Sequence, residues 1–230
     1  MSQVKSAPSA VRLPRSVSCA DAPVGSPTSH VPLTGLIAPS ASANSLGDNS
    51  LANVLLADGN QFDRDWYDFD LVTEAALAVI GADTDNNSKV RLLTDGTVPL
   101  TAFIPNDRAF QALAADLFGF QWWFKSEQQV FTKLATALPI GTIENVLLYH
   151  VVPGATVDKA TAVTITGPVD TALDGAQIQK LRPINAFGGL LQLVDLDPND
   201  VNPIAYKFDL NKGNKQIAHG ISFVLRPADL

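Results

Sequence analysis

The sequence predicts a single α+β domain, in which helices occupy the first half of the folded part and short strands the second. Three observations support this. Apolar residues recur at helical spacing between residues 70 and 149, short segments with strand character follow Gly154, and no second serine- and proline-rich linker interrupts the chain after residue 46. Because helices precede strands rather than alternating with them, a parallel α/β sheet is not expected.

The composition limits the class of protein. Of the 230 residues, 46% are hydrophobic and 17% are charged, which is normal for a globular protein with a sizeable core. The formal net charge of −7 disfavours nucleic-acid binding. The single cysteine, Cys19, excludes an internal disulfide. No stretch approaches the roughly 20 apolar residues of a membrane-spanning helix, so the chain is not expected to span a membrane.

The N-terminal segment differs from the rest of the chain. Residues 1–45 are rich in serine and proline and lack aromatic residues. Such a segment buries too little apolar surface to offset the entropy of ordering it, so we expect 1–45 to be disordered and 46–230 to form the domain. No export signal is visible, because no apolar stretch follows the basic residues. The segment is expected to be a linker or the mature N-terminus of an exported protein.

The first elements are predicted from capping residues and apolar spacing. Asp70 is the expected cap of a helix over 71–80. The run LTAFIP, residues 100–105, predicts a short buried strand that its proline ends. Asn106 or Asp107 then caps a second helix. The apolar face of that helix comprises Phe110, Leu113, Ala114 and Leu117.

The next stretch combines an aromatic connection with two further helices. FQWWF, residues 120–124, lies between helical patterns. Ser126 and Gln129 have the spacing of a capping box and predict a helix that ends at a proline. Thr142 is the expected cap of a short helix that leads into LLYHVVPG, residues 147–154.

Strands are predicted for the remainder of the chain. The candidates are VTIT (163–166), AQIQKL (176–181), LLQLVDL (190–196) and the alternating segment 217–225. The stretch 195–210 between the last two is expected to be a loop.

Three motifs in this order and spacing resemble the fasciclin domain: TAFIPNDRAF (101–110), LLYHVVPG (147–154) and NKQIAHGISFVLRP (214–227). The resemblance spans about Leu46 to the C-terminus, and secreted single-domain actinobacterial members are similar in style. It implies a fasciclin-like fold, with helices packed on a wedge of short, mainly antiparallel strands. The motif residues with an implied structural role are Thr101, Phe103, Pro105, Asn106, Asp107, Phe110, Tyr149, His150, Pro153, His219 and Pro227.

The central histidine of the second motif, His150, is interpreted as a structural brace. A general base needs an accessible pocket and a hydrogen-bonding partner, but aliphatic residues flank this imidazole. The resemblance implies a core hydrogen bond near the first motif, with Asn106 or Asp107 as the partner. Its loss would leave a buried polar group unpaired, at roughly 1–3 kcal/mol. His219, on an apolar face, is likewise expected to be a satisfied core histidine.

No enzyme, cofactor or metal site is predicted. The sequence has no Gly-x-Ser-x-Gly motif, no glycine loop for phosphate and no His/Cys cluster. Two acidic runs, 83–87 and 195–199, open like a calcium loop but lack its sixth-position glycine and its closing glutamate, which leaves only incidental calcium binding. The aspartate-rich segment 58–70 is expected to be solvated surface.

The resemblance implies a non-catalytic extracellular or cell-surface adhesion module, secreted or displayed, whose partner is an extracellular protein or a matrix component. In animal relatives the Tyr-His region is implicated in integrin binding, which gives Tyr149 and His150 a second, adhesive interpretation. A weaker motif match adds Asp209 and Leu210. The alternative is a soluble carrier of an apolar small molecule such as a carotenoid or lipid. In that case Trp122, Trp123 and Phe124 would line a groove rather than fill the core.

Overall fold

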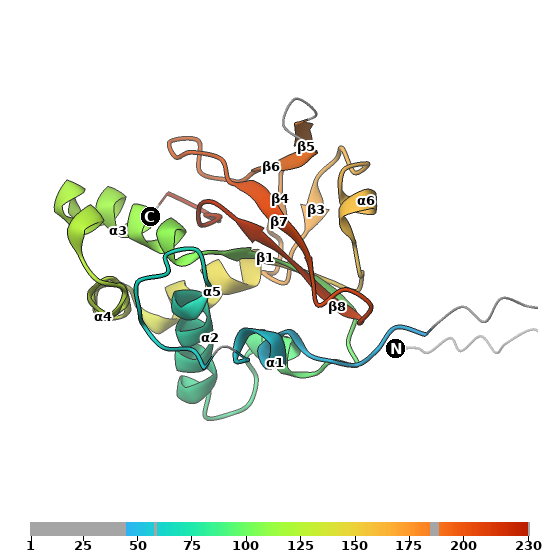
Figure 1. Cartoon of the computed structure of the whole chain (residues 1–230), viewed down its shortest axis with the longest axis horizontal. Helices are drawn as coiled ribbons and strands as arrows, with labels where there is room; N and C mark the ends of the chain where they lie inside the picture. Colours follow the sequence, from blue (N-terminus) through green and yellow to red (C-terminus); the bar gives the residue numbers. More distant parts are fainter. Residues whose placement is uncertain (1–44, 58, 185–188, 230) are drawn as a thin grey trace, which may run out of the picture. The chain divides into compact units, whose positions relative to one another are not determined.

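A six-stranded sheet with the order β2-β1-β8-β7-β6-β5 forms the centre of the fold (Figure 1). Strand β1 pairs in parallel with β8, and the other pairs are antiparallel, as the predicted α+β class implies. The strands of this sheet are β1 (Leu100–Pro105), β2 (Val151–Pro153), β5 (Lys180–Ile184), β6 (Leu190–Val194), β7 (Ile204–Leu210) and β8 (Gln216–Ile221). A separate hairpin consists of β3 (Val169–Asp170) and β4 (Gln177–Ile178).

The computed structural model describes residues 45–57, 59–184 and 189–229. The predicted N-terminal segment, residues 1–45, lies outside the described residues except for Ser45. None of the helices in the described ranges combines the length and the apolar character that crossing a membrane requires.

Helices cover the two faces of the sheet unequally (Figure 1). Five α-helices and one 3-10 helix contribute buried side chains to the larger of two cores, and a second 3-10 helix packs against its margin. They are α1 (Leu51–Leu55), α2 (Asp70–Ala82), η1 (Lys89–Thr94), α3 (Asp107–Phe118), η2 (Phe120–Phe124), α4 (Glu127–Ala137) and α5 (Ile140–Tyr149). The short α6 (Lys159–Ala162) contributes instead to the smaller core.

The two cores explain why the central strands are buried on both faces. In β1, Leu100, Ala102 and Ile104 belong to the larger core, whereas Phe103 belongs to the smaller one. Successive side chains of a strand point to opposite faces, so a strand between two cores is buried throughout. All six residues of β8 are buried for the same reason, although its sequence predicts an alternating strand.

The capping predictions are confirmed where the cap is local. Asn106 caps α3, since its side chain accepts the Ala109 N–H at 3.0 Å. Ser126 and Gln129 form the capping box of α4. The predicted cap of α2 is wrong, because Asp70 is the first helical residue and Phe69 precedes it.

The predicted start of α5 is also wrong. Helix α5 begins at Ile140, before Thr142, and Pro139 is its N-cap residue.

The strand predictions are confirmed in part. Strand β6 lies within the predicted 190–196 segment, and 176–181 contains β4 and the start of β5. The predicted strand 163–166 is wrong: it follows α6, and the Ile165 N–H donates to the Ala162 carbonyl in a turn. The predicted loop 195–210 contains β7.

Candidate functional site

The second motif places its histidine in the interior, at the end of α5. The side chain of His150 is 4% exposed. Its Nδ1 lies 2.7 Å from the Val146 carbonyl oxygen, and its Nε2 accepts the Leu225 N–H at 2.9 Å. The imidazole is therefore neutral with the proton on Nδ1, and both nitrogens are hydrogen-bonded. Burial lowers the pKa of His150 to about 4.

These contacts correct the expected partner. Neither Asn106 nor Asp107 bonds to His150, since Asn106 caps α3 and donates to the Tyr206 hydroxyl at 2.7 Å, and Asp107 accepts the Leu71 N–H at 2.9 Å. The histidine instead joins α5 to the segment that follows β8.

The neighbouring tyrosine is also interior. Tyr149 is 0% exposed, and its hydroxyl donates to the Gln177 carbonyl at 2.8 Å. Burial raises the pKa of Tyr149. A partner at the surface does not reach Tyr149 or His150 in this structure, so the adhesive interpretation of these two residues is corrected.

The histidine of the third motif, His219, lies between two aromatic rings. Its ring centroid lies 5.7 Å from that of Phe103 and 5.3 Å from that of Phe208. Its Nδ1 accepts the Asp209 N–H at 3.2 Å, and its Nε2 lies 2.9 Å from the Val157 carbonyl oxygen. Burial lowers the pKa of His219. This geometry is that of a core histidine with both nitrogens bonded.

The other motif residues differ in how far they are buried. Thr101, Phe103 and Phe110 are buried, Pro105 ends β1, and Pro153 is exposed while Pro227 is half-buried. Thr101 donates to the Ala155 carbonyl and accepts the Val157 N–H, which ties β1 to the chain after β2.

Asp209 and Leu210, the two residues suggested by the weaker motif match, are half-buried. Asp209 accepts the Lys159 N–H and pairs with Lys212, while Leu210 packs against the larger core. The contacts of Asp209 are therefore made within the chain.

The aromatic cluster 120–124 forms η2, and its side chains diverge. Trp122 packs against the larger core and lies edge-on to Phe118, with ring centroids 6.0 Å apart. Phe120 and Phe124 are 71% and 76% exposed, and their rings meet edge to face at 5.6 Å. We refer to Phe120, Trp123 and Phe124 as the η2 aromatic surface.

Helix α3 holds this surface in place. The buried side chain of Gln111 donates to the Trp123 carbonyl at 3.2 Å and to the Lys125 carbonyl at 3.3 Å. The guanidinium of Arg108 lies over the Trp123 ring, 4.6 Å from its centroid. The exposed phenylalanines therefore project from a fixed base.

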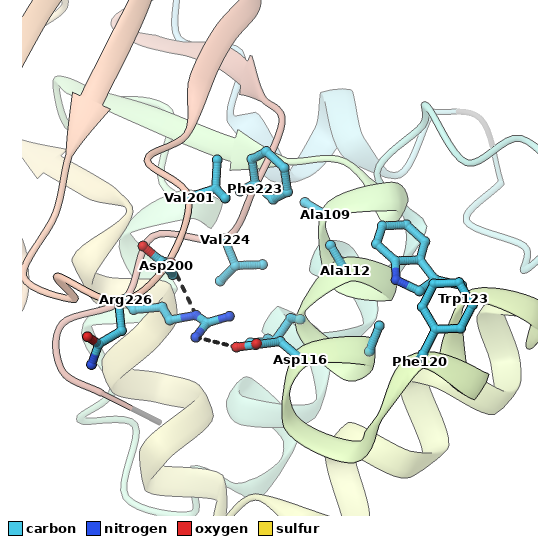
Figure 2. Close-up of a pocket in the computed structure, with 13 residues that line it drawn as sticks. Ala109, Ala112, Asp116, Phe120, Trp123, Asp200, Val201, Phe223, Val224 and Arg226 are labelled. Atoms are coloured by element: carbon cyan, nitrogen blue, oxygen red, sulfur yellow. Dashed lines mark ion pairs between the residues drawn. The ribbon is translucent and has the colours of Figure 1, made fainter.

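A pocket of about 350 Å³ lies beside the η2 aromatic surface (Figure 2). Phe120 and Trp123 line one side of it, and Phe223 and Val224 line another. Arg226 lies opposite the aromatic rings and joins α3 to the segment between β6 and β7. It pairs with Asp116 of α3 at 2.8 Å and with Asp200 at 3.3 Å.

The arginine also reaches an interior carboxylate. Arg226 lies 3.3 Å from Asp197, whose side chain is 0% exposed. The Arg226 N–H donates to Asp195. The positive charge of Arg226 therefore compensates carboxylates of the acidic run 195–199. In the run 83–87, Arg91 pairs with Asp83 at 2.7 Å.

A second cavity, of about 180 Å³, is almost entirely apolar and lies between α2, α3, α4 and α5. Trp122, Trp123 and Phe124 do not line this cavity, whereas Trp123 lines the pocket beside the η2 aromatic surface. Its lining includes Leu71, Phe110, Phe131, Leu134, Ile143 and Leu147.

Several residues of these sites escape sequence reasoning. Phe120, Asp116 and Arg226 belong to no motif that points to binding, and only the unusual density of aromatic residues at 120–124 gives a signal.

Comparison with known proteins agrees with the motifs. Residues 76–182 match the family model of the Fasciclin domain. Among solved structures, the chain is similar to a FAS1 domain pair from the insect cell adhesion molecule Fasciclin I, with 15% identity and a TM-score of 0.43. That alignment covers 60% of this chain and 42% of the other, so this chain spans less than half the length of its structural relative. No curated protein matches the chain. The matched region contains the first two motifs, and over residues 76–182 this chain is similar to the Fasciclin domain family.

Proposed function

We propose that this protein is a non-catalytic interaction module, extracellular or at the cell surface, which binds a protein partner through the η2 aromatic surface. The observation that carries the proposal is the exposure of Phe120 and Phe124, at 71% and 76%, on a rigid base. Fasciclin domains are typically adhesion-related and non-catalytic. This supports a binding role for an aromatic surface that the fold does not use for its own core.

Physical chemistry favours a protein partner at this surface. Exposed aromatic clusters beside polar groups are typical of protein interfaces, whose centres are enriched in Phe, Tyr, Trp and Arg. The adjoining pocket offers a place for one apolar side chain of the partner. Asp116, whose side chain is 60% exposed, adds a carboxylate at the edge. With the net charge of −7, this favours a partner segment that is apolar and basic.

The double variant Phe120→Ala/Phe124→Ala tests this proposal. We expect attachment of cells or of extracellular-matrix proteins to a surface coated with the chain to fall by about tenfold or more, because each buried aromatic residue of an interface centre contributes more than 1 kcal/mol. The melting temperature should be unchanged, since both rings are exposed. Leu77→Ala, an exposed residue of α2 outside this surface, is the matched control. Equal attachment by all three proteins would contradict the proposal.

The second candidate function is a carrier of an apolar small molecule, and the cavity between α2, α3, α4 and α5 favours it. Its volume of about 180 Å³ is below the roughly 300–1,000 Å³ of drug-sized ligand sites. This size favours a short apolar molecule or part of one acyl chain over a long carotenoid.

Filling this cavity distinguishes the carrier from the interaction module. Ala78 lines the cavity from α2, so Ala78→Phe should lower the binding of a fluorescent fatty acid by about tenfold, because the added ring occupies the ligand's volume. Leu77→Phe adds a ring at an exposed position outside the lining and should bind as the wild type does. Absence of binding by the wild type, together with an organic extract free of lipid by mass spectrometry, would rule out the carrier.

A further inference from the structure

A second pocket, of about 440 Å³, adjoins the pocket of Figure 2. The two share three lining residues, which are Ala112, Trp123 and Phe223. Because Trp123 lines both, its ring lies at their boundary. Tyr67 and Tyr206 complete the aromatic lining of the second pocket, which we call the tyrosine pocket. We refer to this pocket and that of Figure 2 together as the paired pockets.

One wall of the tyrosine pocket comes from the aspartate-rich segment 58–70. The expectation that this segment is solvated surface is wrong for its C-terminal end, where Asp70 is 2% exposed. Tyr67 is 66% exposed. The backbone beside it is attached to α3, since the Arg108 N–H donates to the Trp66 carbonyl at 2.9 Å. The exposed tyrosine therefore projects from a segment that the fold holds in place.

The other two rings are held by side chains of the same region. The Tyr206 hydroxyl accepts a hydrogen bond from the Asn106 amide at 2.7 Å. The Trp123 ring lies under the Arg108 guanidinium, and its backbone carbonyl accepts from Gln111 at 3.2 Å. Binding to rings that are already fixed costs less conformational entropy than binding to mobile ones.

The polar groups that remain available in the tyrosine pocket are chiefly donors. The side chain of Asn106 is used within the chain, in the cap of α3 and in the bond to Tyr206. The Ser222 hydroxyl oxygen accepts the Ile204 N–H at 3.0 Å. The Trp123 indole N–H has no acceptor among the hydrogen bonds found in the described residues, and the Tyr206 hydroxyl keeps its own proton to donate. A ligand that complements this pocket supplies acceptors.

The pocket of Figure 2 adds negative charge at the other end. A single guanidinium, that of Arg226, pairs with Asp116, Asp197 and Asp200. Three carboxylates against one cation leave an excess of negative charge, and the Asp116 side chain is 60% exposed. A basic side chain that enters this pocket beside Phe120 meets both a carboxylate and an aromatic ring.

A proline-rich segment in the polyproline II conformation has the chemistry that these pockets complement. Proline has no backbone N–H, and this helix has no internal hydrogen bonds, so its carbonyl groups are free to accept. With three residues per turn, side chains three positions apart lie on one face at a spacing of about 9 Å. Such segments dock in grooves lined by aromatic residues.

We propose that the paired pockets bind a proline-rich segment of the partner in the polyproline II conformation. Its prolines lie against Tyr67, Trp123 and Tyr206, and a basic residue of the segment enters the pocket of Figure 2. This inference rests on the proposed function, since it names the kind of segment that is recognised at and beside the η2 aromatic surface.

Fluorescence anisotropy of a labelled synthetic peptide, Pro-Leu-Pro-Pro-Leu-Pro-Arg-Arg, titrated with the full chain, tests the proposal. We expect binding that saturates below about 1 mM, because the segment is ordered before it binds. A peptide with alanine in place of every proline keeps the charge and should bind about tenfold more weakly or worse. A peptide with glutamate in place of both arginines should lose affinity to a similar degree.

Variants of the protein place the peptide on the paired pockets. Tyr67→Ala removes an exposed ring and should weaken binding by about tenfold without changing the melting temperature. Trp123→Phe keeps a ring but removes the indole N–H, and Asp116→Asn removes the exposed charge, so each should weaken binding several-fold. Leu77→Ala, outside both pockets, is the control and should bind as the wild type does.

The outcomes separate this proposal from the proposed function. Equal binding of the proline-free peptide would overturn the proposal, because any apolar, basic segment would then fit. Unchanged affinity in Tyr67→Ala and Trp123→Phe would overturn it as well. Absence of peptide binding at 1 mM, while Phe120→Ala/Phe124→Ala still lowers attachment, would overturn this proposal alone. Peptide binding that depends on Tyr67, with attachment unchanged in that double variant, would support the paired pockets and contradict the proposed function.

Discussion

His150→Ala is expected to lower the free energy of unfolding by about 3–5 kcal/mol. The substitution leaves a cavity at a position that is 4% exposed, removes the acceptor of the Leu225 N–H, and removes the donor to the Val146 carbonyl. Val146 depends on this donor, because the His150 N–H bonds to the Leu147 carbonyl instead of continuing the regular helical ladder. Urea unfolding at neutral pH measures the loss. Phe124→Ala, at 76% exposed, is the control and should change stability by less than about 0.5 kcal/mol.

The pH dependence of this loss identifies the neutral imidazole as its cause. The pKa of His150 is lowered to about 4 in the folded protein, against about 6.5 in the unfolded chain. The stabilisation is therefore fully present above pH 6.5 and is lost as the pH falls towards 4, where the unfolded chain binds a proton that the folded protein excludes. The stability difference between wild type and His150→Ala should shrink by about 3 kcal/mol over this range. A difference that does not vary with pH would contradict the brace.

The comparison with the variant is needed because two buried acidic residues, Asp107 and Glu127, change stability with pH in the opposite direction. Asp107 and Glu127 have raised pKa values in the folded protein. Their contribution to stability is present at low pH and is lost as the pH rises through about 7 to 9. Both proteins share this contribution, so it cancels in the difference, and the histidine alone remains.

The elements that sequence reasoning predicts correctly depend on short-range signals. A cap and its acceptor lie three residues apart in Asn106 and in the capping box of Ser126, and the structure confirms both. Strand β1 is a short, mostly apolar run that ends in proline, a pattern typical of a buried strand. Helices α3 and α4 therefore follow from local chemistry.

The errors have physical causes too. Strand β7 pairs irregularly with β8, with register shifts near Lys207 and Leu210, and Asp209 has a φ of 62°. A strand of this kind has no clean alternation to detect. The partner of His150 is a backbone N–H that lies 75 residues away in sequence, and backbone groups carry no sequence signature.

The candidate sites were less predictable than the fold for a related reason. In η2, neighbouring aromatic residues point in different directions, so Trp122 packs on the core while Phe124 is exposed. An aromatic residue suits either position, and the sequence does not reveal that Gln111 binds the backbone carbonyls of Trp123 and Lys125 here. Asp70 and Asp107, the first residues of α2 and α3, lie close together although they are far apart in sequence, which no single segment of the sequence reveals.

Arg226→Met is expected to cost about 3–5 kcal/mol of stability at pH 7, because it removes the cation from a buried set of carboxylates. The Asp197 side chain is 0% exposed, and the Asp200 side chain is 9% exposed. Methionine retains most of the apolar length of arginine, so the loss reports chiefly on charge. Arg182→Met is the matched control, since Arg182 is exposed and bonds only to Gln192 among the hydrogen bonds found in the described residues. Urea unfolding of the two variants measures the difference.

Acidification should restore part of the stability lost in Arg226→Met. Burial, with the nearby charge of Asp195, raises the pKa of Asp200 to about 6 even with the arginine in place, and removing the arginine raises it further. A carboxyl group with a raised pKa favours the folded state at low pH and loses this contribution as the pH rises. The difference from wild type should therefore be smaller at pH 5 than at pH 7. A loss equal to that of Arg182→Met, or one that grows on acidification, would mean that these carboxylates are hydrated and that the arginine does not stabilise the wall of the pocket in Figure 2.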